Sequence, residues 1–321
     1  MRRSTVSTGR RASAAATSAG GRWTGKRRLE DGNLRGDQEA RVSKGQNGGV
    51  GLALGGGGAR GLAHIPVLEA LDELGVRPER IAGTSIGAIF GAAYASGMTG
   101  AEIRAHTLDV LGQPARVLRK LMELLPRGFR EMFTRSALMP AQFDAGRVID
   151  LFLPAGVKQD FCELEIPLSI VATDFYGWHE AELTTGPLRQ AIAASIALPV
   201  IFRPVTMGGR VLIDGGIVNP LPVDKLAGSK LVIAVDVVGG PEKRAKRETP
   251  SATEAIFGAS QILMQAIITE KLRHDKADIL LRPAINQFRV LDFLKARAIL
   301  EAAGPVKEEL KIRLDQVLSA V

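Results

Sequence analysis

The feature that most constrains the fold is a repeated alternation of apolar stretches, glycine-rich turns and helix-like segments from residue 49 onward. The stretch VGLALGGGG (50–58) predicts a strand that enters a glycine loop, and ARGLAHIPVLEALDELG (59–75) predicts the helix that follows. The stretch RIAGTSIGAIFGAAYAS (80–96) repeats this order of strand, turn and helix. Further strands are predicted at PLSIVATDF (167–175), RVLID (210–214) and KLVIAVDVV (230–238). Such alternation is typical of a mostly parallel sheet between helical layers, so we expect a three-layer α/β/α domain over residues 49–321.

The glycine loop GGGGARG (55–61) allows two interpretations. Its spacing fits the dinucleotide loop, in which backbone N–H groups hold a pyrophosphate, but the same bare backbone can hold the oxyanion of an acyl transfer. A dinucleotide fold needs an acidic residue after the second strand, and that strand runs into Ser85 instead. A P-loop is excluded because no Gly-Lys-Ser/Thr follows. Since no His, Cys and Asp cluster has metal-ligand spacing either, we expect neither a cofactor nor a metal.

The motif GTSIG (83–87) matches G-x-S-x-G between a predicted strand and a predicted helix, which is the setting of a nucleophile elbow. Gly83 and Gly87 remove the side chains that would clash where strand and helix meet at a sharp turn. Ser85 would then lie at a helix N-terminus, where the helix dipole favours developing negative charge. The alternative is a buried turn in which Ser85 only caps the helix.

A nucleophilic serine needs a base, and the sequence offers three candidates. The order Ser-Asp-His leaves only His274, which lies in the charged segment EKLRHDKAD and is better explained as a surface residue. Asp214 ends the predicted strand RVLID and precedes two glycines, whose bare backbone lets another group approach closely. Asp174, which has one following glycine nearby, is the second choice and is better explained as a turn residue.

The basic charge of the chain is concentrated at its N-terminus. Residues 1–48 hold 11 of the 42 Lys and Arg but only 4 of the 34 Asp and Glu, so the rest carries 31 basic and 30 acidic residues. A near-neutral body argues against nucleic acid as a partner. We expect residues 1–48 to form a disordered basic tail, since they lack the apolar core of a secretory signal. The single cysteine, Cys162, fits a reducing compartment, and we expect a cytoplasmic protein, at most peripheral at a membrane.

Residues 102–165 interrupt the alternation and have a mostly helical pattern, which predicts a helical insertion or cap. Within it, apolar residues at helical spacing lie beside five basic residues at 116–130, which permits either ordinary packing or contact with a lipid surface. The uncharged segment 81–101 contains five glycines and predicts a buried strand and helix rather than a membrane span. Ser251 and Glu254 predict a capping box at the start of a helix that runs to about Arg273.

Taken in order, the motifs GGGARG (56–61), GTSIG (83–87) and DGG (214–216) resemble those of the patatin-like phospholipases, the bacterial members in particular. The resemblance spans about residues 49–285 and includes ASIALPVIFRPV before the DGG motif. It implies a Ser85–Asp214 dyad without histidine. It also implies that the loop of Gly56, Gly57 and Gly58 forms the oxyanion hole, with the N–H groups of Gly57 and Gly58 as donors and Arg60 as its support.

The resemblance implies an enzyme that cleaves acyl esters of phospholipids or lysophospholipids through an acyl-enzyme. One departure is Pro66, where family members usually carry glycine; within a helix that starts near Ala59, this proline would bend the helix. Two alternatives remain open from the residues alone. One is a triad esterase that uses His274 on soluble esters, and the other is a non-catalytic module that binds lipid or nucleotide with the glycine loop.

Overall fold

The computed structural model describes residues 49–113, 119, 143–241 and 249–319. These residues all fall within one compact unit. The expected basic tail at 1–48 and, except for Arg119, the expected basic helix at 116–130 lie outside the described residues. Three described helices lie in the expected insertion at 102–165: α4 (Gly100–Leu111), which begins two residues before it, α7 (Ala145–Phe152) and the short helix η2 (Phe161–Glu163).

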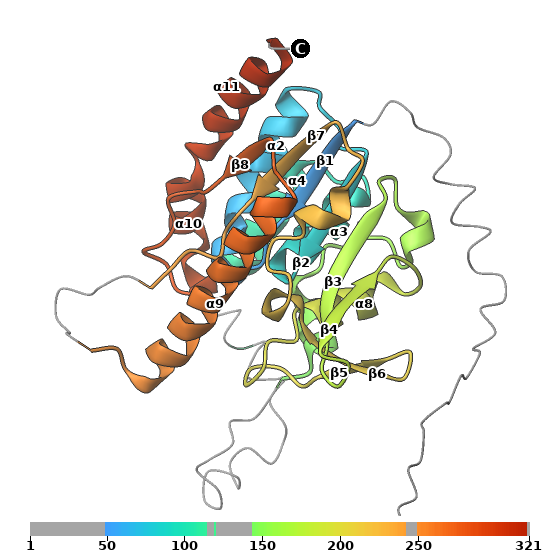
Figure 1. The fold of residues 1–321 in the computed structure, drawn as a ribbon, viewed down its shortest axis with the longest axis vertical. Coiled ribbons are helices and arrows are strands. Elements are labelled where there is room, and N and C mark those ends of the chain that lie inside the picture. Colours follow the sequence, from blue (N-terminus) through green and yellow to red (C-terminus); the bar gives the residue numbers. More distant parts are fainter. Residues whose placement is uncertain (1–48, 114–118, 120–142, 242–248, 320–321) are drawn as a thin grey trace, which may run out of the picture. The chain divides into compact units, whose positions relative to one another are not determined.

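The core of the fold is a mixed, mostly parallel sheet in the order β5-β6-β3-β2-β1-β7-β8, with β4 paired to β3 (Figure 1). Four strand pairs are parallel, namely β3–β2, β2–β1, β1–β7 and β7–β8. Three pairs are antiparallel, namely β3–β4, β3–β6 and β5–β6. The strands are β1 (Val50–Leu54), β2 (Arg80–Thr84), β3 (Leu168–Asp174), β4 (His179–Leu183), β5 (Val205–Met207), β6 (Arg210–Asp214), β7 (Leu231–Val235) and β8 (Ile279–Leu281). The strands predicted from the sequence are all present.

Each face of the sheet has its own apolar core, because side chains alternate between the faces of a strand. Leu52, Leu54 and Ile81 belong to the larger core, whereas Ala53 and Ala82 belong to the smaller one. The larger core contains residues of α2 (His64–Glu73), α3 (Ile86–Ala95), α4, α7, α8 (Leu188–Ser195), α10 (Ala296–Ala303) and α11 (Val306–Ser319). The smaller core contains residues of η4 (Val223–Leu226) and α9 (Ala252–His274), which Figure 1 shows in front of the sheet. The arrangement is the expected three-layer α/β/α fold.

Several local predictions can be compared with the structure. The uncharged segment 81–101 forms the buried strand β2 and helix α3, and no helix in the described part of the chain is long and apolar enough to cross a membrane. Ser251 and Glu254 form the predicted capping box at the start of α9. The expected bend of the helix at Pro66 is wrong, because the helix does not start near Ala59. A 3-10 helix, η1 (Gly58–Ala63), follows the glycine loop, and α2 begins only at His64. Pro66 therefore lies in the first turn of α2, where an α-helix tolerates proline.

Two strands meet end to end along one edge of β3. Val171 pairs with Thr84 at the end of β2, and the next residue, Ala172, pairs with Asp214 at the end of β6. Both β2 and β6 must use the same edge, because β4 pairs with this whole stretch of β3 from the other edge. Since β2 and β6 run in opposite directions along that edge, their final residues come together. The register of β3 thus brings the residue after Thr84 close to Asp214.

Candidate active site

Ser85 lies at a sharp turn between β2 and α3, with φ 55° and ψ −120°. Positive φ is uncommon for a residue other than glycine and marks a strained position. A Cβ on Gly83 would lie 2.6 Å from the Gly87 carbonyl oxygen, and a Cβ on Gly87 would collide with the Leu54 carbonyl. This confirms the predicted reason for the two glycines. The Ser85 side chain makes no capping hydrogen bond to α3, which removes the interpretation of Ser85 as a simple helix cap.

The Ser85 hydroxyl donates to Asp214 instead, with Oγ 2.7 Å from Oδ2 (a part-buried contact). The other carboxylate oxygen, Oδ1, accepts from the Gly216 N–H at 2.7 Å, so both oxygens are held. Burial raises the pKa of Asp214 to about 6, although the hydrogen bonds from Ser85 and Gly216 oppose this shift. A carboxylate of such pKa is a better proton acceptor near neutral pH than an ordinary aspartate, whose pKa is about 3.9.

Ser195, which the sequence analysis does not single out, fixes the backbone of the nucleophile. Its hydroxyl accepts from the Ser85 N–H at 2.8 Å and donates to the Val171 carbonyl at 2.6 Å. It is fully buried at the last residue of α8. The only signal in the sequence is a serine within the apolar segment AIAASIALP, and its partners are 24 and 110 residues away.

The glycine loop passes close to Ser85, since a Cβ on Gly56 would lie 3.4 Å from the Ser85 Cβ. The Gly56 N–H donates to the Pro220 carbonyl at 2.9 Å, so Gly56 contributes close approach rather than a free donor. Within the described chain, the N–H groups of Gly57 and Gly58 donate to no acceptor, and both residues are partly accessible. Gly58 has φ +57°, and a Cβ there would collide with the Val290 carbonyl. Two backbone donors are thus available in the glycine loop, next in sequence to Gly56, which approaches Ser85.

Two buried side chains, those of His64 and Arg60, support the glycine loop. His64, which the sequence analysis left without a role, is fully buried, and its Nε2 lies 2.9 Å from the Gly55 carbonyl oxygen. Because a carbonyl only accepts, Nε2 carries the proton, and burial lowers the pKa of His64 to about 4. Arg60 is 1% exposed, and its guanidinium Nη1 lies 2.7 Å from the side-chain amide of Gln261 in α9. Burial lowers the pKa of Arg60 to about 10, against the attraction of Asp236.

The remaining base candidates lie away from these contacts. His274 is the last residue of α9, its side chain is 76% exposed, and it lies 3.6 Å from Glu270. His106 contacts the Phe152 carbonyl, so none of the four histidines, all of which lie in described parts of the chain, hydrogen-bonds Ser85 or Asp214. Asp174 accepts from the Gly177 N–H at 2.9 Å and orders the turn that follows β3.

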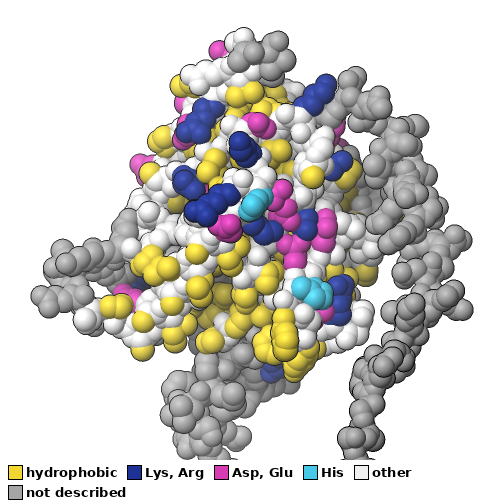
Figure 2. All heavy atoms as spheres, viewed as in Figure 1, with side chains coloured by type: hydrophobic (Ala, Val, Ile, Leu, Met, Phe, Trp, Pro, Cys, Tyr) yellow, Lys and Arg dark blue, Asp and Glu magenta, His cyan; other side chains and the backbone are white. Residues whose placement is uncertain are grey.

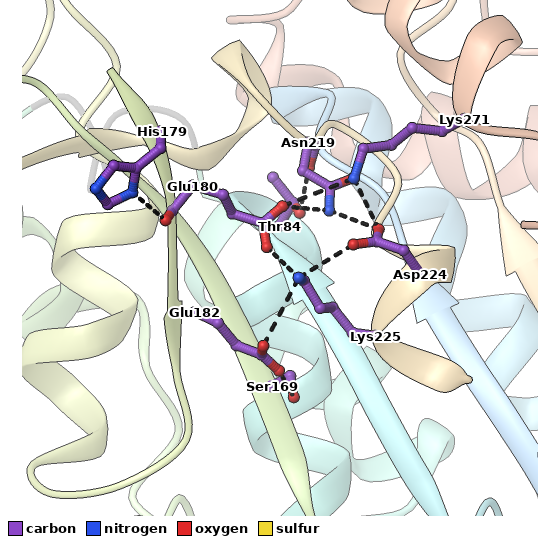
Figure 3. Close-up of polar contacts among 9 residues, drawn as sticks. All are labelled: Thr84, Ser169, His179, Glu180, Glu182, Asn219, Asp224, Lys225 and Lys271. Atoms are coloured by element: carbon purple, nitrogen blue, oxygen red, sulfur yellow. Dashed lines mark hydrogen bonds and ion pairs between the residues drawn. The ribbon is translucent and has the colours of Figure 1, made fainter. Parts of the chain in front are cut away.

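A polar cluster anchors the segment that follows Asp214 (Figure 3). Asn219 is fully buried, and its carbonyl accepts from the Thr84 hydroxyl at 2.8 Å, one residue before the serine. Its amide donates to Glu180 at 2.6 Å and to Asp224 at 2.8 Å. Two lysines from η4 and α9 complete the cluster. The structure thereby ties the ends of β2, β4 and α9 to the loop between Asp214 and η4.

The two lysines pair with the same carboxylates. Lys225 contacts Glu180 and lies 3.1 Å from Asp224 Oδ2, and Lys271 lies 2.9 Å from Asp224 Oδ1. Although burial opposes the shift, the hydrogen bonds with Glu180 and Asp224 raise the pKa of Lys225. The carboxylates of this cluster are therefore occupied by cations of the protein itself. No group of three or more His, Cys, Asp or Glu side chains among the described residues is arranged to hold a metal ion.

The chain matches a protein-family model and several known proteins. The family model described as patatin-like phospholipase matches residues 52–227, which contain the glycine loop, Ser85 and Asp214. An uncharacterised NTE family protein of Mycobacterium tuberculosis is 37% identical over 206 residues, which cover 64% of this chain and 53% of that protein. Human patatin-like phospholipase domain-containing protein 6 is 34% identical over 205 residues, which cover 62% of this chain and 14% of that protein. The chain thus spans about half the length, or less, of these relatives.

Among solved structures, VipD from Legionella pneumophila aligns with 71% of this chain and 55% of its own, with 18% sequence identity and a TM-score of 0.36. A likeness of this size adds nothing to the argument from the family and from the geometry around Ser85.

Proposed function

The chain belongs to the patatin-like phospholipase family, and from this membership and the geometry of its site we propose that it is a serine hydrolase that cleaves carboxylic esters of phospholipids or lysophospholipids. Ser85 is the proposed nucleophile and Asp214 its general base. The observation that carries the proposal is the 2.7 Å hydrogen bond from Ser85 Oγ to a buried carboxylate whose pKa is raised to about 6. An activated serine with an adjacent base is the arrangement that acyl transfer requires.

In the acylation step, Ser85 Oγ attacks the ester carbonyl carbon while its proton passes to Asp214 Oδ2. The carbonyl oxygen becomes an oxyanion, which the free N–H groups of Gly57 and Gly58 can stabilise from the glycine loop. When the tetrahedral intermediate collapses, the C–O bond to the leaving group breaks and the proton on Asp214 goes to the leaving alkoxide. This step produces an acyl-Ser85 ester and a free alcohol, with lysophospholipid as the alcohol when a diacyl phospholipid is cleaved.

In the deacylation step, Asp214 takes a proton from a water molecule that attacks the acyl-Ser85 carbonyl, and the same two N–H groups hold the second oxyanion. Collapse breaks the bond to Ser85 Oγ, which recovers the proton from Asp214, and a fatty acid leaves. Since Asp214 must be ionised to accept a proton, we expect the rate on a soluble ester to fall as the pH drops through about 6.

Gel labelling with a fluorescent fluorophosphonate tests the proposal, because this probe phosphonylates an activated serine with loss of fluoride. We expect labelling of the wild-type protein and of His274→Ala, and none of Ser85→Ala or Asp214→Asn, with folding of each variant checked by circular dichroism. Loss of labelling in folded His274→Ala would support the triad instead. No labelling of the folded wild-type protein would overturn the proposed hydrolase activity and favour a non-catalytic binding module.

A second measurement addresses the substrate class. The purified protein would be compared on a soluble short-chain ester and on phosphatidylcholine and lysophosphatidylcholine, with release of fatty acid measured by mass spectrometry. Turnover of at least one of the two lipids, lost in Ser85→Ala, is expected. Turnover of the soluble ester alone would restrict the proposal to a general esterase.

A further inference from the structure

The turn that joins β3 to β4 exposes three aromatic side chains. Phe175, Tyr176 and Trp178 are 49%, 73% and 89% exposed, in a chain with only 15 aromatic residues. Phe175 and Tyr176 contact each other edge to face, with their ring centroids 5.0 Å apart. Large apolar side chains gathered at one exposed point usually mark an interaction site.

Trp178 occupies a conformation that its side chain disfavours. Its φ is 60°, in the left-handed region where glycine and asparagine are common and bulky residues are outliers. Since the indole is almost fully exposed, no packing within the described chain compensates for this strain. The turn holds this conformation through the Trp178 N–H, which donates to the Asp174 carbonyl at 3.0 Å, and strained residues of this kind cluster at binding and active sites.

Helix α9 presents a second apolar surface. Residues 255–269 contain no charged side chain, and on the outer face Ile256, Ile262 and Leu263 are about 60% exposed. The inner face of the same stretch faces the candidate site, since Met264 lies against Gly216 and Gln261 against Arg60. Charged residues return only in the last turns of the helix, from Glu270 onward.

Both surfaces belong to the side of the molecule that carries Ser85. Strand β3 continues three residues beyond Val171, the partner of Thr84, so it projects about 10 Å past Thr84, the residue before the serine, at the usual rise per residue. Ile217 is exposed three residues after Asp214, and Leu291 is exposed next to Val290, whose carbonyl contacts the glycine loop. In Figure 2, hydrophobic side chains gather over the lower part of the face, where Figure 1 places β4 and the first half of α9, and charged side chains gather above them.

We propose that these side chains form an apolar rim, defined as Tyr176, Trp178, Ile217, Ile262, Leu263 and Leu291, which docks the protein on the surface of a phospholipid bilayer. The inference rests on the proposed function for the choice of partner, because a lipid ester must pass from the bilayer to Ser85 through this side. Tyr and Trp are the residues that concentrate at membrane interfaces. The six rim side chains carry no charge, so the rim fits the apolar boundary of a zwitterionic bilayer without anionic lipid.

The fluorescence of Trp178 provides a direct test. The chain has two tryptophans, so Trp23→Phe leaves Trp178 as the single reporter. With phosphatidylcholine vesicles, we expect a blue shift of its emission, and quenching when the acyl chains carry bromine. An unshifted emission at a vesicle concentration where the protein cosediments would overturn the placement of the rim at the bilayer.

Cosedimentation with the same vesicles separates the rim from other exposed apolar residues. The double variant Ile262→Ser/Leu263→Ser should weaken partitioning onto vesicles at least tenfold, because burial of each of these side chains in the bilayer contributes to the free energy of binding. The matched control is Ile312→Ser on α11, which is similarly exposed at 59% and should change partitioning less than twofold. Equal effects of the rim and control substitutions, or none from either, would overturn the proposal.

Trp178→Asn makes a sharper variant, since asparagine tolerates the left-handed conformation. We expect its Tm to rise while its partitioning on vesicles falls several-fold, which a purely structural role of Trp178 would not produce. Unchanged partitioning would contradict the rim. Size-exclusion chromatography with light scattering tests whether a second copy of the chain covers the rim instead of a bilayer. A concentration-dependent dimer that the rim substitutions dissociate would assign this surface to a second copy and overturn the proposal.

The two proposals can fail separately. Turnover of a soluble ester reports the candidate site alone, and the ratio of vesicle activity to soluble-ester activity reports the rim. We expect this ratio to fall at least tenfold in Ile262→Ser/Leu263→Ser. Absence of soluble-ester turnover and of fluorophosphonate labelling in the wild-type protein would overturn the proposed hydrolase, whatever the vesicle binding. An unchanged ratio in a labelled, active protein would overturn only the rim.

Discussion

Ser85 and Asp214 share a hydrogen bond but are held in different ways. Ser85 is set by its own pentapeptide, in which the turn needs Gly83 and Gly87 because carbonyl oxygens occupy the space of their side chains. Its backbone N–H also donates to a residue far away in the described chain, the Ser195 hydroxyl. The nucleophile is therefore set by backbone atoms, both those of its own pentapeptide and those at the end of β1, which packs against Gly87.

Asp214 is set by residues that are far apart in the sequence. Its backbone carbonyl accepts from Thr173, and its position follows from the pairing of β6 with β3. The segment after it is held by Asn219, which the polar cluster of Glu180, Asp224 and the two lysines anchors. One half of the proposed dyad thus depends on backbone geometry at a sharp turn, and the other on buried side-chain contacts between distant elements.

The strongest test of the half that depends on backbone geometry is Gly87→Ala. The added methyl group would meet the carbonyl groups of Leu54 and Gly55, which are backbone atoms and cannot move aside. We expect the free energy of unfolding to fall by about 3 kcal/mol or more, or the protein not to fold, with loss of fluorophosphonate labelling. Urea unfolding followed by circular dichroism gives the measurement.

Gly91→Ala is the matched control on the same helix. A Cβ there would lie 3.2 Å from Ile81 and 3.3 Å from Leu168, and both contacts are with side chains, which can adjust. Alanine also favours a helix interior over glycine, so we expect a change within about 1 kcal/mol and normal labelling. Equal losses from the two substitutions would show that helix packing in general, and not the turn, sets the position of Ser85.

Asp214→Asn addresses the distant half and should raise stability while abolishing labelling. The folded pKa of about 6 lies above the unfolded value of about 3.8, so the folded state prefers the protonated acid. The contribution of Asp214 to stability is full below about pH 4 and is lost as the pH rises through about 6. Asparagine removes this cost, and we expect a gain of up to about 3 kcal/mol at pH 8.

The pH dependence distinguishes this mechanism from a general effect of the substitution. The gain of Asp214→Asn over the wild-type protein should shrink toward zero below about pH 4, where both side chains are neutral. Titration of the buried His64 acts in both proteins and cancels from the difference. A gain independent of pH, or a loss of stability at pH 8, would contradict the raised pKa of Asp214.

The same division explains what the sequence could predict. The strands, the α/β/α order and the turn at Ser85 follow from local patterns, namely apolar stretches and glycines at fixed spacing. Ser195 and Asn219 could not be assigned roles in this way, because a buried polar residue takes its role from partners that only the fold brings near. The role of His64 was hidden for the same reason, and the start of α2 was misplaced because a 3-10 helix precedes it.

Asn219→Ala tests whether the distant contacts matter for chemistry. It removes two hydrogen bonds to carboxylates, and we expect a loss of about 2 kcal/mol in the free energy of unfolding. If the segment between Asp214 and Asn219 then shifts relative to β2, kcat on a soluble ester should fall about tenfold with little change in KM. Ser169→Ala, which removes an exposed hydrogen bond to Glu182, serves as the control and should change neither value appreciably. An unaltered kcat in a destabilised Asn219→Ala would limit this residue to a structural role.

Lys271→Met should have the smallest effect, and it decides whether charge or the Asn219 amide holds the aspartate segment. Methionine keeps most of the aliphatic volume of lysine but removes the cation 2.9 Å from Asp224, which retains Lys225 and Asn219 as partners. Because the Lys271 side chain is 27% exposed, solvent screens the pair, and we expect a loss below about 1 kcal/mol and a kcat within twofold of the wild type. A loss as large as that of Asn219→Ala, reduced in high salt, would mean that the cluster acts through its charges. The contrast between the two halves would then be one between backbone geometry and electrostatics.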